Sequence, residues 1–392
     1  MNLPRTISGQ QASERRGPLP VPTAVPTKRI EAPARSRYAV VGAGWRSSVY
    51  LRLARLLPDV FDATGVVTRR AEPGERIERD FGVPSFRTVE ELLARDRPDF
   101  VVLSVPWPVT PELTRTLVSA GVPVLAETPP APDLDGMRAL WADVGAAGLV
   151  QVAEQYPFMP LHAARIALTR EGVIGVPGSA QVSSTHLYHA VALMRALLGA
   201  GREPTTVAAR TFTAPLVDPI TPAGWTHDPE AHAARTIVST IDFGGSRSGL
   251  YDFTDNQWWN PVRPDRLTVR GSRGEIHDES VVRMVDAVTP VTSRIERAVT
   301  GVGMNYEGVD LTHLSFDGRV VLRNRFPGAG LSDDELGTAE LLARTGAWAR
   351  DEGPDPYPLA DGLHDHHVGI AIEEAARTGA DVRTGEEPWA HA

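Results

Sequence analysis

The sequence predicts an α/β fold in which a doubly wound parallel sheet is followed by an α+β domain with a large, mostly antiparallel sheet. Three observations support this prediction. Short apolar strands alternate with helical segments up to about residue 153. A glycine turn joins the first strand to the first helix. Beyond about residue 155, β-branched segments separated by Gly-rich turns replace the alternation.

We expect three regions: a disordered leader at 1–36, a first domain at 37–153 and a second domain at 154–392. The leader is rich in Pro, Arg and Ser and has no hydrophobic periodicity. The predicted strands of the first domain are 38–41, 60–67, 100–105, 122–126 and 149–153, and helices at 72–81, 89–94, 113–120 and 133–147 follow a first helix beyond the glycine turn. The second domain has predicted strands at 178–185, 205–210, 236–243, 248–252, 266–270 and 281–285, and helices at 161–169, 188–198, 333–350 and 359–378.

The glycine turn, Gly42-Ala43-Gly44, follows the buried strand at 38–41 and precedes a helix that begins near Trp45 and Arg46. The first glycine permits a tight turn, and Gly44 lets the backbone approach a pyrophosphate at the helix N-terminus. Ser47 stands where the usual fingerprint has a third glycine. The turn therefore predicts a Rossmann dinucleotide site, although an ordinary strand-to-helix turn has the same pattern.

The end of the second strand bears on which nucleotide binds. In an NAD site an acidic residue near this point holds the ribose diol, but this chain has Thr68, Arg69 and Arg70. Arginine and threonine can bind a 2′-phosphate that a carboxylate would repel. The sequence thus favours NADP, with NAD as the alternative.

Ligands of such a sheet bind beyond the carboxyl ends of its strands. The ends of the next two strands add candidate cofactor contacts at Ser104, Pro106 and Trp107, and at Glu127.

Composition limits the possible partners. The chain has 392 residues, a net charge of −9 and no cysteine, which excludes thiolate chemistry and argues against a nucleic-acid surface. It has no apolar run long enough to span a membrane. We expect a cytoplasmic protein without a metal site, acting on a small-molecule substrate.

Several longer segments resemble the Gfo/Idh/MocA family of NAD(P)-dependent oxidoreductases. These are residues 81–84, 90–93, 120–127, 154–160, 172–175 and 271–276, in the order and spacing of that family. The resemblance covers about residues 37–388. It implies a Rossmann domain, a second domain whose open sheet often forms an oligomer interface, and hence a homo-oligomer.

The resemblance also shows departures at the positions that carry the chemistry. The family usually has Glu-Lys-Pro after the strand at 122–126, where this chain has Thr128 in place of lysine. His189 fits the family's helix-opening histidine, but Thr185 and Ala192 replace its flanking acids.

Oxidation of a carbinol needs a hydride acceptor and a base for the hydroxyl proton. His189 is the natural acid/base because imidazole titrates near neutrality. His186 lies three residues earlier, and Tyr156 is a third candidate. Thr128 cannot act as a base, but its hydroxyl can donate or relay a proton.

Three functions remain open: an oxidoreductase for a polyol, sugar-derived or other small hydroxyl or carbonyl compound, a redox-neutral lyase or epimerase with tightly bound nucleotide, and a non-catalytic nucleotide-binding protein. Trp258 and Trp259 could stack on a sugar or line an oligomer interface. His364, His366 and His367 are expected on a solvated turn or helix face.

Overall fold

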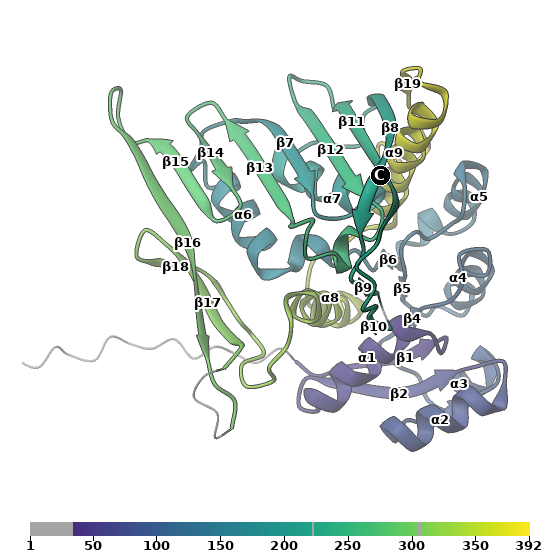
Figure 1. Ribbon diagram of the computed structural model, residues 1–392. Helices are drawn as coiled ribbons and strands as arrows, with labels where there is room; N and C mark the ends of the chain where they lie inside the picture. Colours follow the sequence, from purple (N-terminus) through teal and green to yellow (C-terminus); the bar gives the residue numbers. More distant parts are fainter. Residues whose placement is uncertain (1–33, 222, 304–307) are drawn as a thin grey trace, which may run out of the picture. The chain divides into compact units, whose positions relative to one another are not determined.

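The computed structural model describes residues 34–221, 223–303 and 308–392, and these residues form two sheets with their helices (Figure 1). Residues 1–33 of the predicted leader lie outside the described residues. Strand β1 begins at Ser36, one residue earlier than the domain boundary we expected.

The first sheet has six parallel strands in the order β3-β2-β1-β4-β5-β6. The strands are β1 Ser36–Val41, β2 Phe61–Val67, β3 Ser85–Phe86, β4 Phe100–Leu103, β5 Val124–Ala126 and β6 Val150–Val152. The helices that follow them are α1 Trp45–Leu56, α2 Ala71–Phe81, α3 Val89–Arg95, α4 Thr110–Ser119 and α5 Leu134–Val144, with a 3-10 turn at Gly145–Ala147. This arrangement confirms the predicted doubly wound sheet, to which the sequence had not assigned β3.

Alternate residues of the first sheet enter two different cores. Tyr38 and Val40 of β1 pack with α1, whereas Ala39 and Val41 pack on the opposite face with the residues of α3 to α5. Both faces are covered, which explains why β4 reads as a continuous apolar run.

The second sheet is mixed and mostly antiparallel. Its order is β18-β17-β16-β15-β14-β13-β7-β12-β11-β8-β19, and β7 pairs with β12 in parallel. The bounds are β7 Pro177–Ser183, β8 Thr206–Val217, β11 Ala231–Asp242, β12 Ser248–Thr254, β13 Arg266–Gly271, β14 Gly274–His277, β15 Ser280–Met284, β16 Pro290–Thr300, β17 Asp310–Phe316, β18 Arg319–Arg323 and β19 Val382–Arg383, with a small β9 Ile220–Thr221 and β10 Gly224–Trp225 ribbon. The predicted fold class is therefore confirmed.

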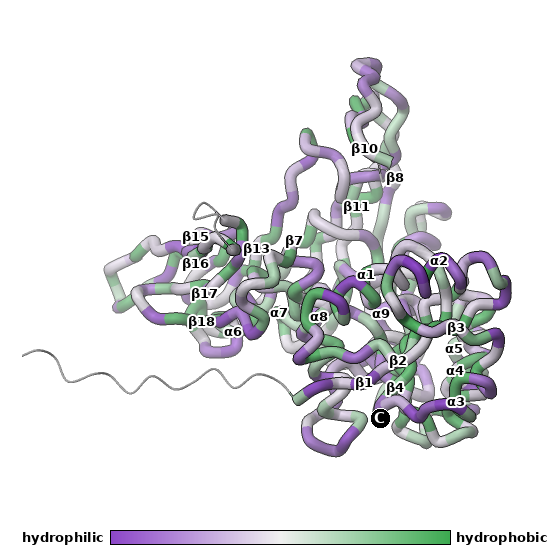
Figure 2. Tube along the Cα trace, turned by 90° about the horizontal axis from the view of Figure 1, so that it is seen from below, coloured by the Kyte–Doolittle hydropathy of each residue, from purple (hydrophilic) through white to green (hydrophobic). Residues whose placement is uncertain are grey.

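This sheet has more and longer strands than the sequence predicted. Strands β14 and β16 to β18 were not predicted, and β8 and β11 each run for 12 residues. Residues 210–215 of β8 are exposed, and the β8–β11 hairpin projects beyond the sheet in Figure 2. Strands that are exposed in this way lack the apolar alternation on which the prediction depended.

Four helices complete the fold: α6 Pro160–Arg170, α7 Leu187–Leu198, α8 Asp333–Ala349 and α9 Leu359–Thr378, together with 3-10 turns at Tyr156–Phe158 (η2) and Gln257–Trp259 (η3). Helices α8 and α9 follow β18 in the chain, yet they also pack on the first sheet. Leu336 of α8 shares a core with Tyr38, and Leu359 and Leu363 of α9 share the other core with Ala39.

The expectation of a solvated histidine cluster at the C-terminus is wrong. His364, His366 and His367 lie on α9 and are 2%, 8% and 6% exposed. Burial lowers the pKa of all three. Helix α9 is covered on several sides, by α7, by β8 and by Trp389 of the C-terminal segment, so its polar residues are buried with its apolar ones.

Among the described residues, no helix combines the length and the apolar character needed to cross a bilayer.

Candidate active site

The glycine turn has the geometry of an anion cradle. Gly42 has φ 123°, and a Cβ there would lie 2.0 Å from the carbonyl oxygen of Ser104. Gly44 has ordinary extended backbone, and a Cβ there would meet open space. The first N–H groups of α1 have no intrahelical acceptor, and its first turn carries no acidic side chain. These features fit a pyrophosphate at the helix N-terminus.

The side chain of Arg46 is directed into the protein. It donates to Glu127 Oε1 at 3.0 Å, to Asp334 Oδ2 at 3.1 Å and to Thr338 Oγ1 at 3.1 Å. Tyr50 also donates to Glu127. Burial by itself lowers the pKa of Arg46, but the neighbouring tyrosine and carboxylates outweigh it and raise that pKa above the usual range. Arg46 therefore remains charged, and its guanidinium is paired with Glu127 and Asp334, so we expect its backbone N–H rather than its side chain to face a phosphate.

At the end of β2, Thr68 is buried while Arg69 and Arg70 are exposed. A third arginine, which the sequence analysis missed, lies beside them. Arg87 Nη1 donates to Thr68 Oγ1 at 2.8 Å and to the carbonyl oxygen of Arg70 at 2.8 Å. The two-residue strand β3, which ends at Phe86, places Arg87 here.

The ends of β4 and β5 hold the other predicted contacts. The carbonyl oxygen of Ser104 occupies the space that a Cβ on Gly42 would need, and Pro106 and Trp107 are exposed. Thr128 follows Glu127 at the end of β5 and is half-buried. Its side chain lies close enough to the hydroxyl of Tyr188, a residue that the sequence analysis did not select, to oppose the rise in pKa that burial causes in that tyrosine.

His189 lies in the first turn of α7, and its ring is fixed by a buried carboxyl group. Its Nδ1 is 2.5 Å from Oε2 of Glu154, which follows β6. His189 Nε2 has no partner among the described residues, and it is not one of their fully enclosed polar atoms. One ring nitrogen is therefore anchored, and the other is accessible.

Burial shifts both members of this pair toward their uncharged forms. It raises the pKa of the Glu154 carboxyl well above its ordinary value. It lowers the pKa of His189 to about 3. The sequence signal for Glu154 was a carboxylate at the end of a buried strand, and it supplies the acidic partner that Thr185 does not.

His186 caps α7, and its ring lies 5.1 Å from that of His189. Burial lowers its pKa to about 3. The rings of the two histidines therefore lie close together, although α7 begins only at Leu187. Leu187 lies between the two histidines in the chain and has φ 38°, a strained conformation for a bulky residue. Its backbone N–H donates a hydrogen bond to the hydroxyl of Tyr251. Such strain occurs preferentially at functional sites.

Aromatic rings surround the two histidines. Tyr156 lies 4.6 Å from the ring of His189, and Trp258 lies 4.8 Å from that of His186. The indole N–H of Trp258 donates to Thr185 at 3.4 Å, and its side chain is 42% exposed. Burial raises the pKa of Tyr156, which therefore stays protonated at neutral pH. Trp258 thus belongs to the wall of this site.

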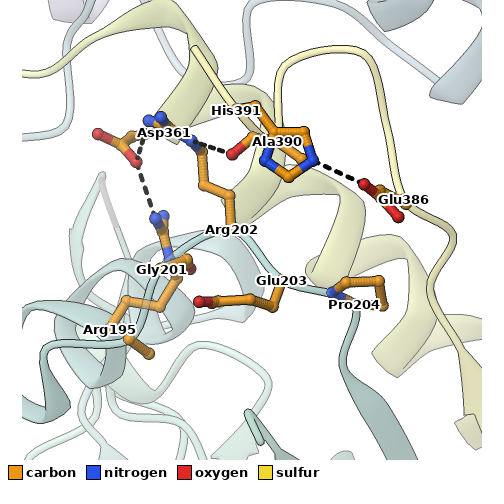
Figure 3. A pocket seen from close by; sticks show the side chains of 10 residues that line it. Arg195, Gly201, Arg202, Glu203, Pro204, Asp361, Glu386, Ala390 and His391 are labelled. Atoms are coloured by element: carbon orange, nitrogen blue, oxygen red, sulfur yellow. Dashed lines mark hydrogen bonds and ion pairs between the residues drawn. The ribbon is translucent and has the colours of Figure 1, made fainter.

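A cavity of about 560 Å³ lies elsewhere, between α7, α9 and the C-terminal segment (Figure 3). None of the predicted site residues lines it. Its two arginines, Arg195 and Arg202, both donate to Asp361, so their charges are already paired. We regard these pairs as part of the framework of the second domain.

The parallel sheet and the glycine turn define a dinucleotide-binding domain. Residues 36–154 match the Gfo/Idh/MocA family model, described as an oxidoreductase family with an NAD-binding Rossmann fold. This segment is therefore similar to the NAD-binding Rossmann domain of that oxidoreductase family, and the match supports NAD or NADP as its cofactor. No curated protein has a significantly similar sequence.

Solved structures extend the likeness in fold to most of the chain. An oxidoreductase from Agrobacterium radiobacter, solved with NAD+, L-tartaric acid and magnesium, is 15% identical with a TM-score of 0.64, covering 89% of this chain and 98% of that one. A myo-inositol dehydrogenase from Corynebacterium glutamicum is 20% identical with a TM-score of 0.60, covering 90% and 99%. A levoglucosan dehydrogenase, solved with NADH and levoglucosan, is 17% identical with a TM-score of 0.63, covering 90% and 100%.

Proposed function

We propose that this protein is an NAD(P)-dependent oxidoreductase for a polyol, a sugar-derived compound or another small hydroxyl or carbonyl substrate. The observation that carries the proposal is the imidazole of His189, anchored at Nδ1 and accessible at Nε2, in a chain whose Rossmann domain has an open glycine cradle. The nicotinamide, when bound, supplies the hydride donor or acceptor.

Each residue of the site has a distinct part in this proposal. His189 Nε2 exchanges the proton of the substrate oxygen, which is the acid–base step that hydride transfer requires. Thr128 and Tyr188 present hydroxyl groups near neutral pH and orient the substrate by hydrogen bonds. Tyr156 and His186 assist as neighbouring donors.

The substrate class follows from the walls of the site. Around His189, the titratable side chains that the structure describes include Glu127, Glu154, Asp334 and Arg46, whose guanidinium is paired with Glu127 and Asp334. This set offers no free cation to an anionic substrate. Trp258 offers an apolar face to a ring. These features support a neutral cyclic polyol or sugar as the substrate. Two of the similar structures are named for compounds of that class, myo-inositol and levoglucosan.

We further propose that NADP is preferred over NAD. Support comes from two exposed arginines, Arg69 and Arg70, and from the bound position of Arg87 beside them. Their positive charges favour a ribose 2′-phosphate. The predicted homo-oligomer stays a prediction.

The test combines nucleotide binding with turnover. Fluorescence titration should show NADPH binding, and a panel of cyclic polyols and sugars should yield a substrate. His189→Ala should then lower single-turnover nucleotide reduction by about 10²–10⁴-fold without changing NADPH affinity.

His232→Ala is the matched control, because His232 also pairs with a carboxylate, Asp228 at 3.0 Å, but is exposed. A His189→Ala rate equal to wild type would exclude His189 as the proton-transfer group. Binding of NADPH without turnover on the whole panel would instead support a non-catalytic protein.

A further inference from the structure

Glu154 is a buried carboxyl group without a cation. Its side chain is 2% exposed, Oε1 accepts the backbone N–H of Tyr156 at 3.2 Å, and Oε2 contacts His189 Nδ1. No arginine or lysine among the described residues forms an ion pair with it. The nearest one of the site, Arg46, is directed to Glu127 and Asp334 instead. A carboxylate in this position would have one backbone donor and two further acids nearby.

Glu387 shows what an ionised buried glutamate looks like in the same protein. Its side chain is 3% exposed, almost as little as that of Glu154, but Arg138 donates to both of its oxygens at 2.8 Å. An unpaired buried charge is expensive, and a buried acid without a cation takes up a proton instead. The contrast indicates that Glu154, unlike Glu387, lacks the cation that would stabilise an ionised carboxylate in such a buried position.

We propose that Glu154 is protonated in the resting protein and donates to Nδ1 of His189, so that the two residues form a neutral proton relay whose outer donor is Nε2–H. This inference rests on the proposed function, because the relay serves the substrate oxygen of that reaction. It assigns Glu154 as a positioning and proton-storing residue that touches the imidazole and not the substrate.

In carbonyl reduction, the relay conserves both protons and charge. A bound reduced nucleotide would supply hydride to the carbonyl carbon, and the carbonyl oxygen would take the proton from Nε2 of His189. As the Nε2–H bond breaks, Nδ1 takes the proton from Oε2 of Glu154. The carbonyl compound becomes the alcohol, the imidazole changes tautomer without ever becoming charged, and the negative charge remains on Glu154 until solvent returns a proton. Oxidation follows the same steps in reverse.

The surroundings favour a relay over a charged imidazolium. Among the described residues, the titratable groups that face the pair are Glu127 after β5, Arg46 on α1, Asp334 on α8, Tyr156 in η2, His186 and Tyr188 at the start of α7, and Tyr357 before α9. Burial lowers the pKa of His189 to about 3 and raises that of Glu154, and both shifts oppose charge separation within the pair. Glu154 therefore stays protonated at a pH above the ordinary pKa of a carboxyl group. It loses its proton only as the pH rises through its raised pKa.

Infrared difference spectroscopy tests the proton directly and needs no substrate. Wild type minus Glu154→Gln at pH 7 should show a protonated-carboxyl C=O band. Wild type minus Glu387→Gln, the matched control, should show ionised carboxylate bands only. A Glu154→Gln difference with carboxylate bands alone would overturn the proposal.

If Glu154→Gln does not fold, nitrogen-15 NMR spectra of the histidines in the wild-type protein provide a second test. His189 should be neutral at pH 7 with its proton on Nε2, and an imidazolium or an Nδ1–H form would also overturn the relay. With a panel of small ketones and ketoses, Glu154→Gln should keep its NADPH affinity and lose about 10²–10⁴-fold in reduction rate, because glutamine can donate to Nδ1 but cannot transfer a proton. Failure to bind NADPH or to reduce any carbonyl would contradict the proposed function, whereas the spectra would still decide the protonation of Glu154.

Discussion

A side chain at the first glycine of the turn should destabilise the fold, whereas a side chain at the second should block nucleotide binding. At Gly42 the φ of 123° costs an L-residue about 1–3 kcal/mol, and the new Cβ would lie 2.0 Å from the Ser104 carbonyl oxygen, which must then move. At Gly44 the backbone is extended, with φ −80° and ψ 178°, and the Cβ position is empty. The loss of a glycine N-cap there costs no more than about 1 kcal/mol.

We therefore expect Gly42→Ala to unfold at clearly lower urea concentration, and Gly44→Val to fold like wild type but to lose NADPH binding. The valine side chain would occupy the space that the cradle keeps open for a pyrophosphate. Urea denaturation followed by circular dichroism measures the first effect, and fluorescence titration with NADPH measures the second. A folded Gly44→Val protein with wild-type affinity would refute the assignment of this turn to the nucleotide.

Two further predictions concern arginines. Replacing Arg69 and Arg70 by alanine should weaken NADPH more than NADH by about 1–3 kcal/mol, since a charged hydrogen bond to phosphate is lost. Equal losses in calorimetry would contradict the NADP preference. Arg46→Met should lower the free energy of unfolding by about 3 kcal/mol, because it leaves Glu127, whose side chain is only 16% exposed, without a cation, while Asp334, 41% exposed, keeps part of its hydration. Arg55→Met, on the exposed side of the same helix, should change urea denaturation by no more than about 0.5 kcal/mol, and a similar loss in both variants would refute the role of the buried pair.

Local patterns were sufficient for much of the fold. The first sheet could be predicted because its strands are buried on both faces and its helices have regular apolar spacing. The antiparallel strands β16 and β18 could not, because they are largely exposed and their apolar residues do not alternate cleanly. Strand β17 is mostly buried, but its apolar residues do not alternate regularly either. The buried histidines of α9 were also missed, since a polar run gives no sign of the elements that will cover it.

The sequence by itself determined the glycine cradle, the arginines after β2 and the histidine pair at the start of α7, because each depends on residues close together in the chain. Only the tertiary structure decided which acid meets His189. Glu154 is 35 residues away in the sequence, and its carboxyl reaches Nδ1 because the end of β6 and the first turn of α7 are packed together. It likewise decided that Arg46 is buried between Glu127 and Asp334, which is 288 residues distant. Contacts of this range depend on how the sheets and helices pack, and no local pattern contains that information.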